Sequence, residues 1–161
     1  MTKLLIIYHS RTGGTRQMAE AAAKAAGEET ETVLKRAEDT GPDDLLAAKG
    51  YLFAAPENLA ALSGAMKEFF DRCYYPALGK IEGRPYGLMI CAGSDGENAA
   101  RQAARIATGW RLKQVQSPLI ISTHAQTEAE ILAEKTIPEN DLAKCRDLGA
   151  ALGAGIEMGV F

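Results

Sequence analysis

Residues 4–15 read LLIIYHSRTGGT, and this stretch decides the fold class. The apolar run Leu4–Tyr8 is typical of a strand that is buried on both faces of a parallel sheet. A loop rich in hydroxyl groups and glycine follows at Ser10–Thr15, and residues 15–26 are rich in good helix formers. A strand, a loop and a helix in this order predict the first unit of a parallel α/β sheet.

The same alternation continues along the chain. The predicted strands are residues 4–8, 31–35, 50–55, 86–92 and 119–122. The predicted helices are residues 15–26, 43–48, 63–73, 98–108 and 140–158. We expect Pro56 to end the third strand, because proline cannot donate to a strand ladder. The pattern predicts one α/β domain over residues 1–161, a doubly wound five-stranded parallel sheet of order 2-1-3-4-5 in a three-layer sandwich.

Composition narrows the function classes. The chain has 161 residues, 47% of them hydrophobic, and a net charge of -3, which gives no reason to expect a nucleic-acid partner. Three scattered cysteines without a Cys-x-x-Cys pair argue against a disulfide framework and against a metal site. The first apolar run is too short for a signal peptide or a membrane span. We therefore expect a cytoplasmic protein with no membrane or metal association.

The loop Ser10–Thr15 has the chemistry of a phosphate site. Its hydroxyl groups can donate to phosphate oxygens, its glycines let the backbone approach closely, and the following helix adds its positive end. Arg11 is the single cation within the loop. The same residue types also satisfy a turn and a helix N-cap, so that structural alternative stays open at this point.

Other phosphate motifs are absent from the sequence. There is no Gly-x-x-x-x-Gly-Lys-Ser/Thr and no Gly-x-Gly-x-x-Gly after the first strand, which disfavours a P-loop NTPase and a dinucleotide Rossmann site. Cys91 has Glu97 rather than arginine six positions later, which disfavours a cysteine phosphatase. The third strand leads into Ala55-Pro56 and not into aspartate, which disfavours a phospho-receiver domain.

Two motifs resemble a known family. The loop Ser10-x-Thr12-Gly13-x-Thr15 resembles the FMN-phosphate motif of flavodoxins. Residues 56–72, PENLAALSGAMKEFFDR, are similar to the loop and helix after the third strand of flavodoxin-like NAD(P)H:quinone reductases and FMN reductases. The resemblance covers residues 3–122 and implies a flavodoxin-like fold that binds FMN.

The resemblance also implies which residues contact FMN. The first loop holds the phosphate, the second lies along the isoalloxazine ring, and the third flanks its other side. In that order these residues are Ser10, Arg11, Thr12, Gly13, Gly14 and Thr15; Pro56, Glu57, Asn58, Leu59, Ala60 and Ala61; and Ala92, Gly93 and Ser94. The reductases often carry an aromatic residue and a glycine in the second loop, where this chain has Leu59 and Ala60.

For function, the resemblance implies that NAD(P)H reduces bound FMN, which then reduces a small acceptor such as a quinone or a flavin. The chemistry resides on the flavin, so no catalytic side chain is required. An electron carrier between redox proteins and a weakly FMN-binding sensing domain are the alternatives. The modest charge and the absence of aromatic residues from the second and third loops favour the reductase. A homodimer is also expected, because symmetric oligomers are common.

A few further side chains lie near predicted element ends. Tyr74, Tyr75 and Trp110 follow helices and precede strands, so we expect them at the end of the sheet opposite the site, in the core or an interface. His124 follows the last strand on the site side, where it could contact substrate or remain an exposed loop histidine. Ser63 is expected to cap a helix.

Overall fold

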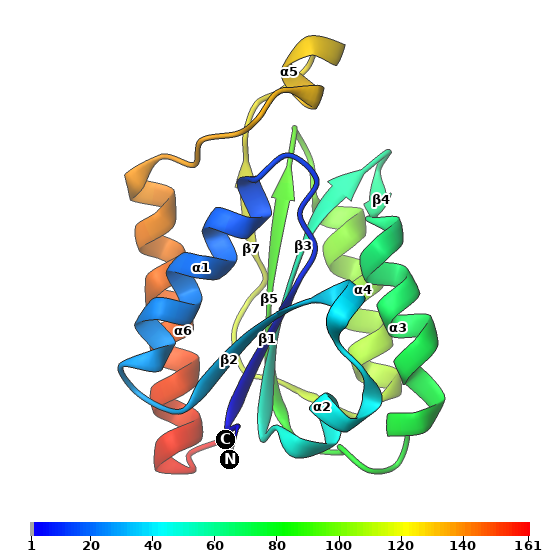
Figure 1. Cartoon of the computed structure of the whole chain (residues 1–161), viewed down its shortest axis with the longest axis vertical. Helices are drawn as coiled ribbons and strands as arrows, with labels where there is room; N and C mark the ends of the chain where they lie inside the picture. Colours follow the sequence, from blue (N-terminus) through cyan, green and yellow to red (C-terminus); the bar gives the residue numbers. More distant parts are fainter. Residues whose placement is uncertain (1) are drawn as a thin grey trace.

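The computed structural model describes residues 2–161 and contains a central, mainly parallel sheet (Figure 1). The main strands follow the order β2-β1-β3-β5, and β7 pairs with the outer edge of β5. Counted along the chain, this is the predicted order 2-1-3-4-5, so the doubly wound α/β prediction is confirmed. The long strands are β1 Leu4–Tyr8, β2 Thr32–Arg36, β3 Gly50–Asn58, β5 Pro85–Ala92 and β7 Leu119–Ser122.

Two short strands complete the sheet. β6, Lys113–Gln114, pairs in parallel with the first residues of β5, and β7 pairs with the last ones. β4, Ala61–Leu62, pairs antiparallel with the end of β3. The sheet edge beside β5 is therefore formed by two separate strands.

Pro56 does not end the third strand, and that prediction was wrong. β3 continues to Asn58, and Pro56 lies opposite Cys91 of β5. Proline lacks an N–H group but keeps its carbonyl, which accepts a hydrogen bond from the Ser63 N–H at 3.2 Å. The extension projects the chain beyond the sheet, where β4 pairs with it.

Helices cover both faces of the sheet. Figure 1 shows α1 and α6 on one side and α3 and α4 on the other. The helices are α1 Gly14–Gly27, α2 Pro42–Ala47, α3 Gly64–Ala77, α4 Glu97–Gly109, α5 Glu128–Leu132 and α6 Glu139–Met158, with a 3₁₀ turn at Ala37–Asp39. Alternate β1 residues supply the two cores: Leu4 and Ile6 pack beneath α1 and α6, whereas Leu5 and Ile7 face the α3 side. The three-layer prediction is confirmed.

The α1–α6 contact depends on small residues. A Cβ added at Gly149 would collide with the Ala22 carbonyl, so the two helix backbones approach closely only because position 149 is glycine. Buried alanines line the same face of α1. This close packing holds the start of α6 beside the loop that precedes α1.

The large aromatic side chains lie in the other core. Phe53 packs against Phe70 with ring centroids 5.2 Å apart, and Trp110 stacks on Tyr74 at 5.6 Å. Trp110 is fully buried and its Nε1 donates to the Tyr74 carbonyl at 2.8 Å. Trp110 is thus a core residue, as predicted, whereas Tyr75 is exposed.

Within residues 2–161, no helix combines the length and the apolar composition that a bilayer crossing requires.

Candidate functional site

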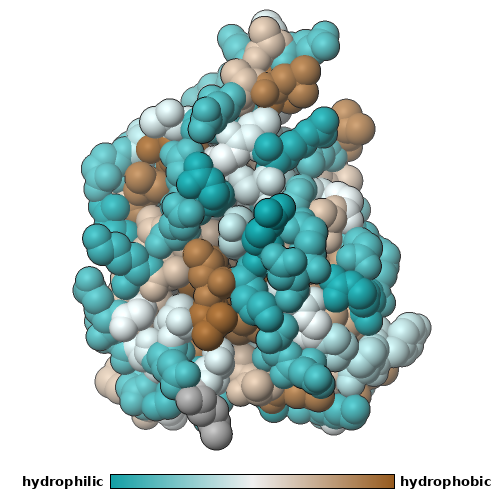
Figure 2. Space-filling model, viewed as in Figure 1, coloured by the Kyte–Doolittle hydropathy of each residue, from teal (hydrophilic) through white to brown (hydrophobic). Residues whose placement is uncertain are grey.

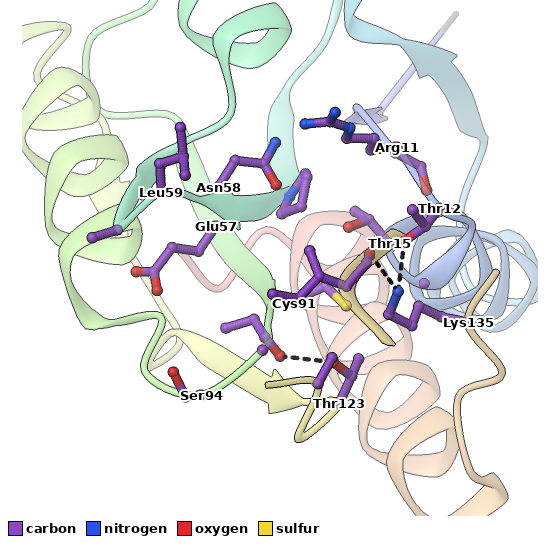
Figure 3. Close-up of a pocket in the computed structure, with 18 of the residues that line it drawn as sticks. Arg11, Thr12, Thr15, Glu57, Asn58, Leu59, Cys91, Ser94, Thr123 and Lys135 are labelled. Carbon is purple, nitrogen blue, oxygen red and sulfur yellow. Dashed lines mark hydrogen bonds between the residues drawn. The ribbon is translucent and has the colours of Figure 1, made fainter. Parts of the chain in front are cut away.

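The loops at the carboxyl ends of β1, β3 and β5 meet around a cavity of about 340 Å³ (Figure 3). This volume lies in the range typical of small-molecule sites, roughly 300–1,000 Å³. The lining residues are Ser10, Arg11, Thr12, Gly14, Thr15, Pro56, Glu57, Asn58, Leu59, Ala60, Cys91, Ala92, Gly93, Ser94, Thr123, Ala125, Gln126, Ile131 and Lys135.

The structure brings nearly all of the sequence-predicted site residues together. Gly13 and Ala61 are the two that do not line the cavity: Gly13 is the N-cap of α1, and Ala61 begins β4. The cavity is also lined by residues that were not predicted to contact FMN, which are Cys91, Thr123, Ala125, Gln126, Ile131 and Lys135. Ile131 and Lys135 follow the last strand in the sequence. No motif near them predicts that they lie beside the first loop.

The first loop is shaped to present backbone donors. Gly13 adopts a left-handed conformation with φ 93°, and its N–H donates to Ser10 Oγ at 3.2 Å. The first helical hydrogen bond runs from the Gln17 N–H to the Gly13 carbonyl. The N–H groups of Gly14, Thr15 and Arg16 consequently have no acceptor within the helix. They form the positive end of α1 at the cavity.

Gly14 is required by the close approach of β5. A Cβ added there would lie 2.8 Å from Cys91 Sγ. Cys91 and Thr15 are themselves buried. Burial raises the pKa of the Cys91 thiol to about 11, against smaller opposing contributions from the Thr15 hydroxyl and the Lys135 charge. At neutral pH the thiol is protonated, so it is not a nucleophile.

Lys135 brings a cation to the first loop. Its Nζ donates to Thr12 Oγ1 at 3.3 Å, to the Ile131 carbonyl at 2.8 Å and to the Ala133 carbonyl at 2.5 Å. Its backbone N–H donates to the Thr12 carbonyl at 2.8 Å. Figure 3 shows the Lys135 side chain turned toward Thr12. Two hydrogen bonds thus join residues that are far apart in the sequence.

The second loop is a tight hairpin between β3 and β4. Asn58 pairs with Ala61, and the two residues between them, Leu59 and Ala60, have φ values of 51° and 60°. Both are left-handed, as in the type I′ turns that normally use asparagine and glycine. Leu59 is fully exposed at the tip, and Asn98 Nδ2 holds the Ala60 carbonyl at 2.6 Å.

The third loop is held by Glu57 and by a close backbone approach. The Glu57 carboxylate accepts hydrogen bonds from the N–H of Gly96 at 2.9 Å and from that of Ala99 at 3.4 Å, at the N-terminus of α4. A Cβ added at Gly93 would lie 2.8 Å from the Ala125 carbonyl oxygen. Position 93 therefore has to be small for β5 and the segment after β7 to meet.

Two histidines flank the site without entering the cavity. His124 is exposed and does not line the cavity; its Nδ1 lies 3.4 Å from Ser122 Oγ. His9 Nδ1 lies 2.9 Å from Ser63 Oγ. Ser63 occupies the N-cap of α3, as predicted, although its side chain makes no capping hydrogen bond. Among residues 2–161, no group of three or more His, Cys, Asp or Glu side chains is placed to hold a metal ion.

The residues present fit FMN. Orphan backbone N–H groups, the Thr12 hydroxyl and the Lys135 ammonium suit a phosphate group. Small residues such as Ala92, Gly93 and Ser94 line the cavity at and after the end of β5, which suits a flat ring lying against backbone.

Solved structures share this fold across almost the whole chain. A flavodoxin from the domain Archaea superposes with a TM-score of 0.78 at 17% identity, covering 97% of this chain and 99% of that one. The two-electron reduced Megasphaera elsdenii flavodoxin gives 0.73 at 21% identity, with coverage of 93% and 98%. A WrbA-like flavodoxin from Agrobacterium tumefaciens gives 0.70 at 21% identity, with coverage of 98% and 99%.

Sequence comparison matches the chain to a flavodoxin and to a family of flavin reductases. A curated flavodoxin of Aquifex aeolicus (strain VF5) is 40% identical over 94 residues, which cover 57% of this chain and 49% of that protein. The chain thus spans about half the length of the curated relative it matches. The model of the NADPH-dependent FMN reductase family matches residues 39–127, more than half of the chain. The chain therefore belongs to the NADPH-dependent FMN reductase family and is a flavodoxin-like, FMN-binding protein.

Proposed function

We propose that this protein is an NAD(P)H-dependent reductase whose acceptor is a small molecule such as a quinone or free flavin. Bound FMN would supply the redox chemistry, taking a hydride from the nicotinamide and passing electrons to the acceptor. The protein's own residues bind the flavin, orient it and control access to its ring. The family description, which names NADPH, supports the choice of reductant.

The absence of aromatic side chains from the cavity lining carries the proposal. Within the described residues, the lining contains no Phe, Tyr or Trp. The rings cluster instead in the core beneath α3 and α4, around Phe53. Where the flavin ring would lie, the protein offers small residues such as Ala92 and Gly93. A ring that no side-chain ring covers leaves a face open for a planar nicotinamide.

The charges at the cavity also support a dinucleotide reductant. Arg11 and Lys135 are the cations of the lining, and Glu57 is its carboxylate. The Glu57 carboxylate is already bound to backbone N–H groups at α4. The lining therefore offers more positive than negative charge, which favours a phosphate-bearing ligand.

The contact residues for FMN belong to the same proposal. The first loop would hold the phosphate, the second would border the ring and the third would flank its other face. The assigned residues are Ser10, Arg11, Thr12, Gly13, Gly14 and Thr15; Pro56, Glu57, Asn58, Leu59, Ala60 and Ala61; and Ala92, Gly93 and Ser94.

The experiment is anaerobic mixing of FMN-loaded protein with NADH or NADPH. We expect the visible flavin absorbance to bleach within seconds, and quinone or free FMN added afterwards should restore it. Free FMN at the same concentration without protein is the control. If protein-bound FMN stays oxidised with both nicotinamides but is bleached by dithionite, the reductase proposal fails.

Electron carriage between proteins is the second candidate. The relative at 40% identity is named a flavodoxin, which favours it. Figure 2 shows hydrophobic surface on the α5 projection and at the tip of the β3–β4 hairpin, where Ile131, Leu132 and Leu59 are exposed. Such a rim suits a transient protein contact. Reduction by a redox protein, with no reaction toward nicotinamides, would establish this function.

Three further points stay predictions. A homodimer is expected to appear as twice the chain mass in sedimentation analysis. Cytoplasmic location is expected from the composition. A sensing role would show as FMN binding too weak to survive gel filtration.

A further inference from the structure

We propose that Lys135 is a positioning residue that makes the site bind FMN in preference to riboflavin, an inference that rests on the proposed FMN site. Lys135 acts through Thr12: its ammonium fixes the Thr12 hydroxyl as an outward donor. It also joins α5 to the phosphate loop. The ligand chemistry that this arrangement recognises is a terminal phosphate dianion.

The hydrogen-bond directions carry the first step. An ammonium has three donors and no acceptor. Those of Lys135 go to Thr12 Oγ1 and to the Ile131 and Ala133 carbonyls. Because Thr12 Oγ1 accepts from Lys135, its own hydroxyl hydrogen is left to donate elsewhere. Thr12 lines the cavity, so a phosphate oxygen there would accept a hydrogen bond from the Thr12 hydroxyl. The Lys135 ammonium would polarise this hydroxyl and so strengthen the hydrogen bond to the phosphate.

The position of Lys135 is fixed by the fold. Gln17 of α1 bridges the segment on both sides: its Nε2 donates to the Lys135 carbonyl at 2.7 Å, and its Oε1 accepts from the Ile137 N–H at 2.9 Å. Ile137 is buried, and its Cδ1 would lie 3.4 Å from a Cβ added at Gly14. The ordering of Lys135 is therefore already achieved before a ligand arrives, which favours binding.

The two cations of the cavity differ in their setting. Arg11 is exposed, whereas Lys135 is half-buried and its charge acts on the buried Cys91 thiol. A half-buried charge is screened less by solvent than an exposed one. Lys135 is consequently the cation with more influence on a phosphate in the loop.

The same ammonium binds the end of α5. Ile131 and Ala133 are at and just after the last turn of this helix, and Lys135 satisfies their carbonyls. α5 has no buried residue, and Figure 1 shows it projecting from the body of the molecule. Ile131 also lines the cavity. The position of α5 at the cavity mouth thus depends on the group that faces the phosphate loop.

The test compares FMN with riboflavin, which differ only in the phosphate. Flavin fluorescence titrations would be run on the wild type, Lys135→Gln, Lys135→Arg and Lys144→Gln. Lys144 is exposed on α6 and pairs with Asp141, outside the cavity, so its variant is the matched control. We expect Lys135→Gln to weaken FMN binding about tenfold, as for loss of a charge-assisted hydrogen bond. Riboflavin binding should stay unchanged, and Lys135→Arg should retain most of the FMN preference.

A double-mutant cycle tests the route through Thr12. Thr12→Val removes the hydroxyl at nearly constant volume. If Lys135 acts through this hydroxyl, the FMN affinity of the Lys135→Gln/Thr12→Val variant is close to that of the weaker single variant. Additive losses would overturn the positioning role. Equal weakening of FMN and riboflavin, or no change in either, would overturn the selectivity.

Failure of the proposed function gives a different result. If the wild type binds neither flavin, inorganic phosphate becomes the probe. A rise in melting temperature with phosphate that is lost in Lys135→Gln and kept in Lys144→Gln would support the inference without the reductase. No response of the wild type to phosphate would overturn it.

Discussion

The β3–β4 turn makes a strong prediction about stability. Leu59 and Ala60 both have left-handed backbones, with φ values of 51° and 60°. This geometry matches the twist of a two-residue hairpin but normally requires glycine or asparagine. A residue with a Cβ is destabilised there by roughly 1–2 kcal/mol, because the Cβ crowds the following carbonyl oxygen. We therefore expect Ala60→Gly to stabilise the protein measured without flavin.

The magnitude follows from two opposing effects. Relief of the left-handed strain at Ala60 contributes roughly 1–2 kcal/mol. The greater freedom of glycine in the unfolded chain offsets roughly 0.5–1 kcal/mol of it. Ala60 is exposed, and Asn98 bonds its carbonyl, which glycine keeps. The net gain should be roughly 0.5–1 kcal/mol, or about 1–4 °C in melting temperature for a domain of this size.

Urea unfolding followed by circular dichroism measures the change. Ala151→Gly is the matched control, since Ala151 is exposed within α6 and a helical glycine costs about 1 kcal/mol. The same substitution should thus raise the unfolding midpoint at position 60 and lower it at position 151, with similar m-values. If Ala60→Gly lowers the midpoint as Ala151→Gly does, the turn is not strained and the reasoning is refuted.

Three further predictions use the site and its surroundings. Gly93→Ala places a Cβ 2.8 Å from the Ala125 carbonyl oxygen; thermal unfolding should show a loss of roughly 1–3 kcal/mol, and an unchanged melting temperature would contradict the close approach. Burial raises the pKa of Cys91 to about 11, so the native thiol should react slowly with iodoacetamide at neutral pH. Mass spectrometry should find the Cys91 peptide alkylated only after denaturation, and rapid alkylation of the native protein would contradict this prediction. Burial alone would raise the pKa of Asp44, but hydrogen bonds from a backbone N–H and from Lys35 lower it below its usual value. The stabilising contribution of Asp44 is therefore present above the unfolded pKa of about 4 and lost as pH falls through the lower folded pKa. Asp44→Asn should lower the free energy of unfolding at neutral pH and progressively less in acid. A difference in unfolding free energy from the wild type that does not change with pH would contradict this prediction.

Much of this protein can be derived from local sequence. The run Leu4–Tyr8 predicts a buried strand, and Ser10–Thr15 predicts the loop that leads into a helix. Both predictions are possible because an apolar run and helix propensity can be recognised within a few residues. Repetition of that unit predicts the strand order and places the loops at one end of the sheet. Even α5 carried a readable signal, since Thr127 and Glu130 form a capping box at the start of the helix.

Tertiary structure decided the remainder. Pro56 could remain in a strand because β5 lies opposite it and Ser63 supplies a donor, neither of which is visible from proline's own propensity. Lys135 reaches Thr12 across 123 positions of sequence, and the link is made by α6 packing closely on α1 and by the Gln17 bridge. Spacing along a chain reports on neighbours within a turn or a strand. A cation placed by the packing of two distant helices depends on the whole core, and so only the folded structure reveals it.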